Sequence, residues 1–101
     1  MSYVSITRLP IKPGSGMELE RVARQALAGR KRWKDQGDLL ATYVARSDDQ
    51  GEYVLVSVWA SKAADEAHED DPADQQAMRE AGSLLAGQPS VFTGEVVAEL
   101  T

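Results

Sequence analysis

One nine-residue stretch constrains the fold more than any other: EYVLVSVWA, residues 52 to 60, carries apolar side chains at most of its positions. Successive side chains of a β-strand point to opposite faces of the sheet. Here both faces are apolar, with Val54, Val56 and Val58 on one and Tyr53, Leu55 and Trp59 on the other. We therefore expect an interior strand that is covered on both sides, or one whose outer face meets another subunit.

A second strand precedes this one and forms a β-hairpin with it. The segment DLLATYVAR, residues 38 to 46, is rich in strand-forming residues, and SDDQG separates it from the stretch above. Ser, Asp and Gly favour a tight reversal of the chain. The two segments therefore predict antiparallel strands joined by a short turn.

The N-terminal third predicts a strand followed by a helix. Residues 3 to 9, YVSITRL, alternate apolar and polar side chains as a strand does. Ser15 with Glu18 three residues later predicts a capping box at the start of the helix, and Gly37 predicts its end. Between them, residues spaced by three and four form one buried helix face: Leu19, Val22, Ala23, Ala26, Leu27, Arg30 and Trp33.

The C-terminal third predicts a helix in two pieces and a last strand. Ser61 suits the cap of a short helix that reaches about His68, and Asp71 with Pro72 predicts the start of another. The apolar stripe of that second piece consists of Ala77, Met78, Ala81, Leu84 and Leu85. The final run SVFTGEVVAEL, residues 90 to 100, predicts a half-exposed strand whose apolar face carries Phe92, Val96, Ala98 and Leu100.

The order of these elements is β-α-β-β-α-β. It predicts an α+β fold of the ferredoxin-like, split β-α-β type, as a single domain over residues 1–101. In this fold a four-stranded antiparallel sheet carries its helices on one face. The other face would then expose the valines of residues 52 to 60 to water, so we expect a homodimer that packs sheet to sheet.

Charge and composition exclude several classes of partner. The net charge is −5, which argues against a nucleic-acid or anionic-membrane surface. The one basic run, residues 30 to 34, falls where a helix ends and cations interact favourably with the helix dipole. The absence of cysteine excludes disulfides, thiolate metal sites and a cysteine nucleophile. The N-terminus lacks the pattern of a signal peptide and no segment has the ~18 apolar residues of a membrane span, so we expect a soluble cytoplasmic protein.

The sequence lacks the motifs of most common reaction classes. A single histidine cannot build a histidine-rich zinc site, and neither a glycine-rich phosphate loop nor a serine-hydrolase elbow is present. The acidic residues between Asp65 and Asp74 lack the spacing and the glycine of a calcium loop, and predict a solvated surface. Pattern alone predicts that Trp59 is a core ring and that His68 is a surface imidazole.

One segment carries a family resemblance. VSVWASKAADEAH, residues 56 to 68, resembles the hallmark stretch of the antibiotic biosynthesis monooxygenase family, and Trp59, Ser61, Ala64 and His68 fall on its positions without a gap. PGSGMELERV, residues 13 to 22, is similar to the family's entry into its first helix. The resemblance implies the dimeric α/β barrel, in which two ferredoxin-like subunits pack sheet to sheet.

The family includes cofactor-free oxygenases of phenols and quinols as well as haem-degrading enzymes. The latter resemble one another in an Asn, a Trp and a His at positions that carry Thr7, His68 and Met78 here, and this chain has no asparagine. Many members continue with Ser-Pro-His where this chain has the sequence 71 to 73, Asp-Pro-Ala. These departures disfavour haem degradation and any mechanism that needs two imidazoles.

The resemblance therefore implies a monooxygenase that needs no cofactor and acts on a small, electron-rich aromatic molecule of phenol or quinol type. His68 is the predicted base and Trp59 a wall on which the substrate stacks. Four further side chains are predicted polar contacts from their strand positions: Thr7, Tyr43, Tyr53 and Ser57. Two alternatives stay open: a non-catalytic, ligand-binding or stress-associated dimer, and a cyclase or isomerase that uses His68 as a base without consuming oxygen.

Overall fold

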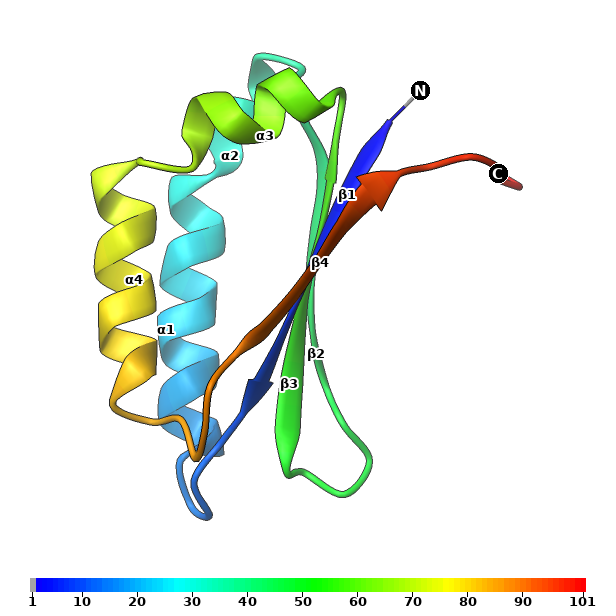
Figure 1. The fold of residues 1–101 in the computed structure, drawn as a ribbon. Coiled ribbons are helices and arrows are strands. Elements are labelled where there is room, and N and C mark those ends of the chain that lie inside the picture. Colours follow the sequence, from blue (N-terminus) through cyan, green and yellow to red (C-terminus); the bar gives the residue numbers. More distant parts are fainter. Residues whose placement is uncertain (1) are drawn as a thin grey trace.

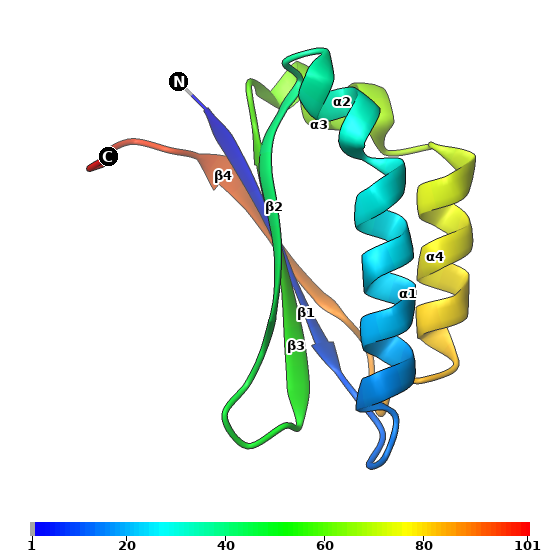
Figure 2. The same ribbon diagram turned by 180° about the vertical axis from the view of Figure 1, so that it is seen from behind.

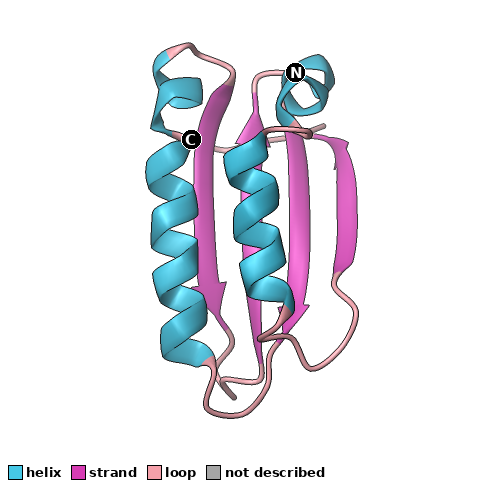
Figure 3. Cartoon of the chain, turned by 90° about the vertical axis from the view of Figure 1, so that its left-hand side faces the viewer, coloured by secondary structure: helices cyan, strands magenta, loops and turns pink. Residues whose placement is uncertain are grey.

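The computed structural model describes residues 2–101 as one sheet with helices on one side of it (Figures 1 and 3). The strands are β1 (Tyr3–Pro10), β2 (Leu39–Arg46), β3 (Glu52–Trp59) and β4 (Ser90–Glu95). The helices are α1 (Gly16–Gly29), α2 (Lys31–Asp35), α3 (Lys62–His68) and α4 (Pro72–Gly82). The predicted order of elements is confirmed, apart from a break that divides the first helix.

The strands lie in the order β2-β3-β1-β4, and every neighbouring pair is antiparallel. This is the predicted ferredoxin-like sheet. β3 lies inside it, between β2 and β1, as its two apolar faces require. In the register of the sheet, Trp59 stands opposite Tyr3 on one side and Leu39 on the other. These three residues therefore share one face.

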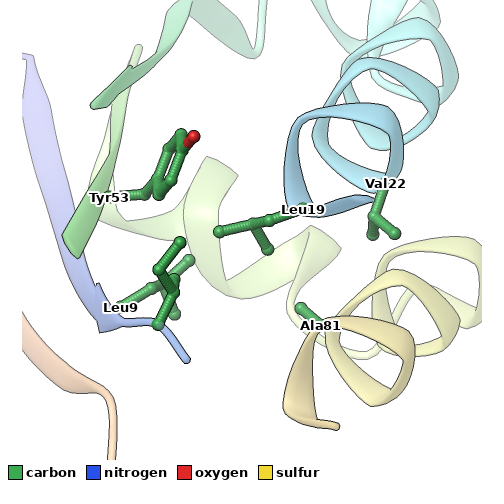
Figure 4. Close-up of a cluster of buried hydrophobic side chains, with 6 residues drawn as sticks. Leu9, Leu19, Val22, Tyr53 and Ala81 are labelled. Atoms are coloured by element: carbon green, nitrogen blue, oxygen red, sulfur yellow. The ribbon is translucent and has the colours of Figure 1, made fainter. Parts of the chain in front are cut away.

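That face is the one the helices cover, and two clusters of buried side chains lie between the layers. The first joins the sheet to α1 and α4, and Figure 4 shows Leu19 of α1 pointing toward Leu9 and Tyr53. The second gathers the large aromatic rings at the other end of the sheet: Tyr3, Trp33, Leu39, Trp59 and Ala64. The two clusters fix α1 and α4 against one end of the sheet, and α2 and α3 against the other.

The opposite sheet face has no helix of residues 2–101 over it (Figures 1 and 2). Its apolar side chains come from all four strands: Val4, Ile6, Tyr43, Val54, Val56, Val58 and Phe92. Tyr43 and Phe92 are the most open of them, with 62% and 61% of their surface exposed. We call this surface the outer face.

The predicted capping box at the start of α1 does not form. Ser15 makes no side-chain cap bond because its backbone, at φ −95° and ψ 2°, is not extended as a capping residue requires. Glu18 instead accepts a hydrogen bond from Arg21 one turn later, at 3.0 Å from Nε. The other two caps are confirmed, since Ser61 accepts from the Ala64 N–H and Asp71 from the Asp74 N–H.

The predicted last strand is too long. β4 ends at Glu95, and of the residues beyond it Val96 still donates a hydrogen bond to the Ser2 carbonyl. In the described sheet β1 is the only neighbour of β4, and β1 begins at Tyr3. Residues 97 to 100 therefore have no strand residue to pair with, although their sequence alternates.

None of the helices described for residues 2–101 has the length and apolarity needed to cross a membrane.

Gly37 ends α2 as predicted, and its conformation generates a stability prediction. Its φ is +86°, a left-handed conformation that side chains other than glycine adopt at a cost, and it lets the Asp38 N–H bond the Trp33 carbonyl at 3.1 Å. We expect Gly37→Ala to lower the free energy of unfolding by about 1 kcal/mol in urea denaturation.

The matched control is Gly29, which closes α1 without a positive φ, and a methyl group added at its Cα would meet nothing within 4 Å. Gly29→Ala should be neutral or stabilising by up to about 1 kcal/mol, because alanine is the better helix former. Equal losses in the two variants would contradict the role given to Gly37.

Candidate functional site

Arg30 lies at the junction between α1 and α2, and only 11% of its side chain is exposed. Its Nε and Nη2 donate to the two carboxylate oxygens of Asp74, at 3.0 and 2.7 Å. Its Nη1 donates to the Ser57 hydroxyl at 2.9 Å. One guanidinium thus links the α1–α2 junction to α4 and to the middle of the sheet.

Local structure explains why this cation points inward. Arg30 falls on the buried stripe of the helix, and the helix breaks there, since the backbone of Arg30 caps α1 and starts α2. Asp74 lies in the first turn of α4, where the positive end of the helix dipole favours a carboxylate. A second bond, from Arg32 Nη2 to Asp71 at 2.7 Å, ties the cap of α4 to α2.

Two tryptophan rings pack beside Arg30, and His68 stacks on one of them. The Arg30 Cζ atom lies 5.5 Å from the ring centroid of Trp33 and 5.8 Å from that of Trp59, within the range of cation–π attraction. His68 stacks on Trp33, with centroids 4.3 Å apart, and lies 5.9 Å from Trp59. The imidazole is also held by a hydrogen bond of 3.0 Å between His68 Nε2 and the Asp38 carboxylate.

A small apolar cavity of about 60 Å³ adjoins Arg30, between the sheet, α1 and α4. Its walls are aliphatic, with Leu19, Leu27, Val44, Leu55 and Ala77 among them. Of the described residues that line it, only Arg30 and Asp74 are charged. Sites for drug-sized ligands usually measure about 300–1,000 Å³, so this cavity holds a fused ring system only after a helix has moved.

The arrangement suits an aromatic anion. Three of the five N–H groups of Arg30 are occupied by Asp74 and Ser57. A fourth N–H group, on Nη1, makes a long hydrogen bond of 3.5 Å to the Thr42 hydroxyl. The guanidinium therefore keeps one free N–H group for a ligand, and the long bond to Thr42 is the one most easily exchanged. In an apolar cavity such donors interact with an anion more strongly than they would in water.

The six residues predicted as site residues do not share one cavity. Ser57 and Trp59 contact Arg30, and His68 stacks on Trp33, but none of the three lines the cavity. Thr7 lies on the helix side of β1, opposite Leu55. Tyr43 lies on the outer face, opposite Val56, and is separated from the cavity by the sheet.

Tyr53, the sixth, is fully buried at the other end of the sheet. Its hydroxyl donates to the Glu20 carboxylate, which also accepts from Arg46 at 3.0 Å. Burial, and then the bond to Glu20, raise the pKa of Tyr53. The same bond from Tyr53 is the largest of the effects that lower the pKa of Glu20, and the nearby charge of Arg46 adds to it. Tyr53 therefore stays neutral near pH 7 and acts as a donor.

Arg30 and Asp74 were missed by sequence reasoning, although one signal was present. Arg30 occupies the apolar stripe of its helix, and a cation on a buried stripe requires a buried partner. The interpretation as a basic run at a helix end is right about the position of Arg30, which caps α1, but it missed that the guanidinium is buried and paired. Arg32 and Lys34 lie in the last turn of α2, as the same interpretation requires. Asp65 also faces this region: burial raises its pKa, and the charge of Arg30 opposes that rise.

A family model described as antibiotic biosynthesis monooxygenase matches residues 2–80. No curated protein matches the chain.

Solved structures share the fold. A proposed antibiotic biosynthesis monooxygenase from Caulobacter crescentus is 22% identical and superposes with a TM-score of 0.85, over 96% of this chain and 91% of that one. Rv0793 from Mycobacterium tuberculosis is 20% identical with a TM-score of 0.82, and each chain is covered in full. A variant of SnoaB, a cofactor-independent oxygenase from Streptomyces nogalater, is 19% identical with a TM-score of 0.78, over 98% and 96%.

The contacts of Arg30 generate a second stability prediction. Arg30→Met removes one partner of a mostly buried ion pair and leaves Asp74 uncompensated, so we expect a loss of about 2–4 kcal/mol in the free energy of unfolding. Lys31→Met removes an adjacent cation whose pair with Asp35 is exposed at both ends. It should change stability by less than about 0.5 kcal/mol. Similar small losses in both variants would contradict the linking role of Arg30.

Proposed function

The chain belongs to the antibiotic biosynthesis monooxygenase family, and from that membership we propose that it oxidises an electron-rich aromatic substrate of phenol or quinol type with molecular oxygen. The observation that carries this proposal is the apolar cavity with Arg30 in its wall. A cation held by fixed partners beside a water-poor space stabilises a substrate anion without having to reorganise.

The chemistry needs such an anion. A phenol or quinol that has lost its proton is rich enough in electrons to reduce O₂ itself, so the substrate supplies the electrons and no cofactor is required. At an activated CH₂ carbon, one oxygen atom becomes the new carbonyl, the other leaves as water, and the two hydrogens removed from carbon enter that water. The protein then has three tasks: to favour the anion, to hold it, and to exclude water.

We assign the first task to Arg30. Its guanidinium stabilises the negative charge on the substrate oxygen, and Ser57 and Asp74 fix its orientation. Trp59 and Trp33 support it from behind by cation–π contact. In this proposal Trp59 acts on the substrate through Arg30, rather than as the stacking wall expected from the sequence.

Binding of a ring system requires α4 to move. Ala81 is the only residue of α4 that is buried. The helix is attached largely by charged contacts: Arg30 with Asp74, Arg32 with Asp71, and Arg21 with Glu80 at 3.8 Å. Two of these pairs, Arg32–Asp71 and Arg21–Glu80, have exposed arginines and contribute little to stability. The mostly buried Arg30–Asp74 pair is thus the main charged attachment of α4, and a helix with so few attachments separates from the sheet more easily than one held by a buried apolar face.

His68 enters the proposal as the base on the resemblance alone, because the cavity does not reach it. Its contacts with Trp33 and Asp38 also suit a residue that positions the aromatic rings. Thr7, Tyr53 and Tyr43 lack a contact with Arg30 and carry no assigned step. The cytoplasmic location expected from the sequence stays a prediction.

The same observations define the main alternative, a ligand-binding protein without turnover. The cavity and Arg30 suffice to bind an aromatic anion, whereas among the described residues that line the cavity the only evident base is Asp74, which is held by Arg30. A cyclase or isomerase would bind the same kind of substrate and leave the oxygen concentration unchanged.

We also propose that the chain forms a homodimer through the outer face. Seven apolar side chains meet there, and two of them are more than half exposed. Water-exposed apolar surfaces of this kind mark interfaces in soluble proteins. α1 and α4 lie on the other side of the sheet, so each subunit keeps its own cavity.

Oxygen uptake tests the proposed reaction. With anthrone- and quinol-type substrates, and without added flavin or metal, the protein should consume one O₂ per substrate above the uncatalysed rate. Binding of the same compounds without uptake would favour the ligand-binding alternative, and isomerised product without uptake would favour the cyclase or isomerase.

The His68→Phe variant then tests the base, because phenylalanine keeps a ring to stack on Trp33 and cannot take a proton. Turnover should fall by ~100-fold or more if His68 is the general base. Unchanged turnover would leave His68 with a positioning role only.

Sedimentation tests the dimer. The wild-type protein should sediment at about 22 kDa, twice the 11.0 kDa of one chain. Phe92→Asp places a charge in the outer face and should shift the protein toward the monomer. Met17→Asp is the matched control, since Met17 is 89% exposed on α1 and away from that face. A wild-type monomer at micromolar concentration would contradict the interface.

A further inference from the structure

A groove runs between α1 and β2, on the helix side of the sheet and near the β2 edge. Figure 2 shows how these two elements lie relative to each other. The groove consists of two hollows, of about 400 and 240 Å³, that meet at Leu27. Its apolar floor comes from Leu27, Leu39 and Val44. We call it the α1–β2 groove. The larger hollow is within the size range of small-molecule sites.

The α1–β2 groove adjoins the cavity. Ala23, Leu27 and Val44 line both the larger hollow and the cavity, and Arg30 lines both the smaller hollow and the cavity. A ring system lying in the groove is therefore separated from the cavity by one layer of side chains.

The groove is positively charged on a chain whose net charge is −5. Five cations line it: Arg24, Arg30, Lys31, Lys34 and Arg46. Three carboxylates pair with them, because Arg24 and Arg46 share Glu20, Arg30 has Asp74 and Lys31 has Asp35. Lys34 has no acidic partner among residues 2–101, and its Nζ lies 3.5 Å from the Leu40 carbonyl. Two positive charges are left uncompensated.

The other approach to the cavity has no surplus of positive charge. A hollow of about 210 Å³ lies between α1 and α4, and shares Val22, Ala26 and Ala77 with the cavity. Its charged residues are Asp71, Asp74 and Glu80, which pair with Arg32, Arg30 and Arg21, and no Lys or Arg of the described chain lines it. This side therefore offers an anion no surplus of positive charge, whereas the side of β2 does.

We propose that the α1–β2 groove is the binding site through which an aromatic carboxylate reaches the cavity. Its ring lies on Leu27 and Val44, and its carboxylate binds Arg24 and Arg46, which have only one carboxylate between them. Its phenol end points toward Arg30. This inference rests on the proposed function for the reaction at the phenol end, whereas the recognition of the carboxylate stands on the charges of the groove.

Two fluorescent probes distinguish the contribution of the carboxylate to binding from that of the phenol. 6-Hydroxy-2-naphthoate has both groups, at opposite ends, and 2-naphthol lacks the carboxylate. The wild-type protein should bind the naphthoate at least ~10-fold more tightly, because charge-assisted hydrogen bonds to arginine are strong. The double variant R24Q/R46Q should lose that preference. The matched double variant K62Q/R79Q removes two exposed cations from α3 and α4 and should keep it.

Further measurements localise the site and guard against misfolding. Amide shifts in a ¹⁵N-labelled protein should change at Ala23, Leu27 and Val44 when the naphthoate is added. Added NaCl should weaken naphthoate binding and leave 2-naphthol unaffected, a test that needs no variant. Thermal melts of R24Q/R46Q check that the loss of the Arg46 contact has not unfolded the chain.

Three results would overturn the proposed binding site. They are equal affinity of the wild-type protein for both probes, a preference for the naphthoate that survives R24Q/R46Q, and amide shifts confined to Phe92 or to the hollow between α1 and α4. Failure of the proposed function is distinct from these. Tight, arginine-dependent naphthoate binding without oxygen uptake would refute the oxygenase proposal and support the groove as a binding site. Oxygen uptake that does not depend on the carboxylate of the substrate would support the oxygenase and refute the groove.

Discussion

The guanidinium of Arg30 is the interaction on which the site depends. Through Asp74 it holds the start of α4, through Ser57 it reaches the central strand, and by cation–π contact it meets both tryptophans. Burying a cation is costly unless its hydrogen bonds are satisfied, and an ion pair of this kind fixes geometry more reliably than it adds stability. The cavity exists because this pair holds α4 in place over an interface that buries little of the helix.

Much of the fold follows from the sequence, because it depends on patterns within single elements. The apolar residues on both faces of β3 require an interior position, and the β-α-β-β-α-β order leaves few topologies. The pairing of Arg30 with Asp74 was not predictable in this way, since it joins residues 44 positions apart and depends on where one helix breaks. The end of β4 escaped prediction for a similar reason, because it is set by the start of β1 rather than by its own alternation.

The residues that carry the family resemblance have structural roles here. Trp59 is buried at the end of β3, Ser61 caps α3, Ala64 is buried in the same cluster as Trp59, and His68 stacks on Trp33. These contacts explain why the segment identifies the fold, which it joins at the turn from sheet to helix. They also explain why it left the chemistry open, since the cation in the cavity wall comes from the end of α1, well before Trp59 in the chain. Net charge was equally uninformative: an acidic chain keeps a cationic groove because charge acts locally, within about 10 Å at moderate salt.

In the proposed site, Arg30 in the cavity wall stabilises the anion of a bound phenol. The most direct measurement is the pKa of a small chromophoric phenol, 4-nitrophenol, whose phenolate absorbs visible light, titrated free and when saturated with the wild-type protein. Arg30 should lower the pKa of the bound phenol by about one unit or more, as an opposite charge within contact distance does. If the pKa of the bound phenol equals or exceeds that of the free phenol, Arg30 does not have this role, because an apolar cavity without an effective cation disfavours the anion.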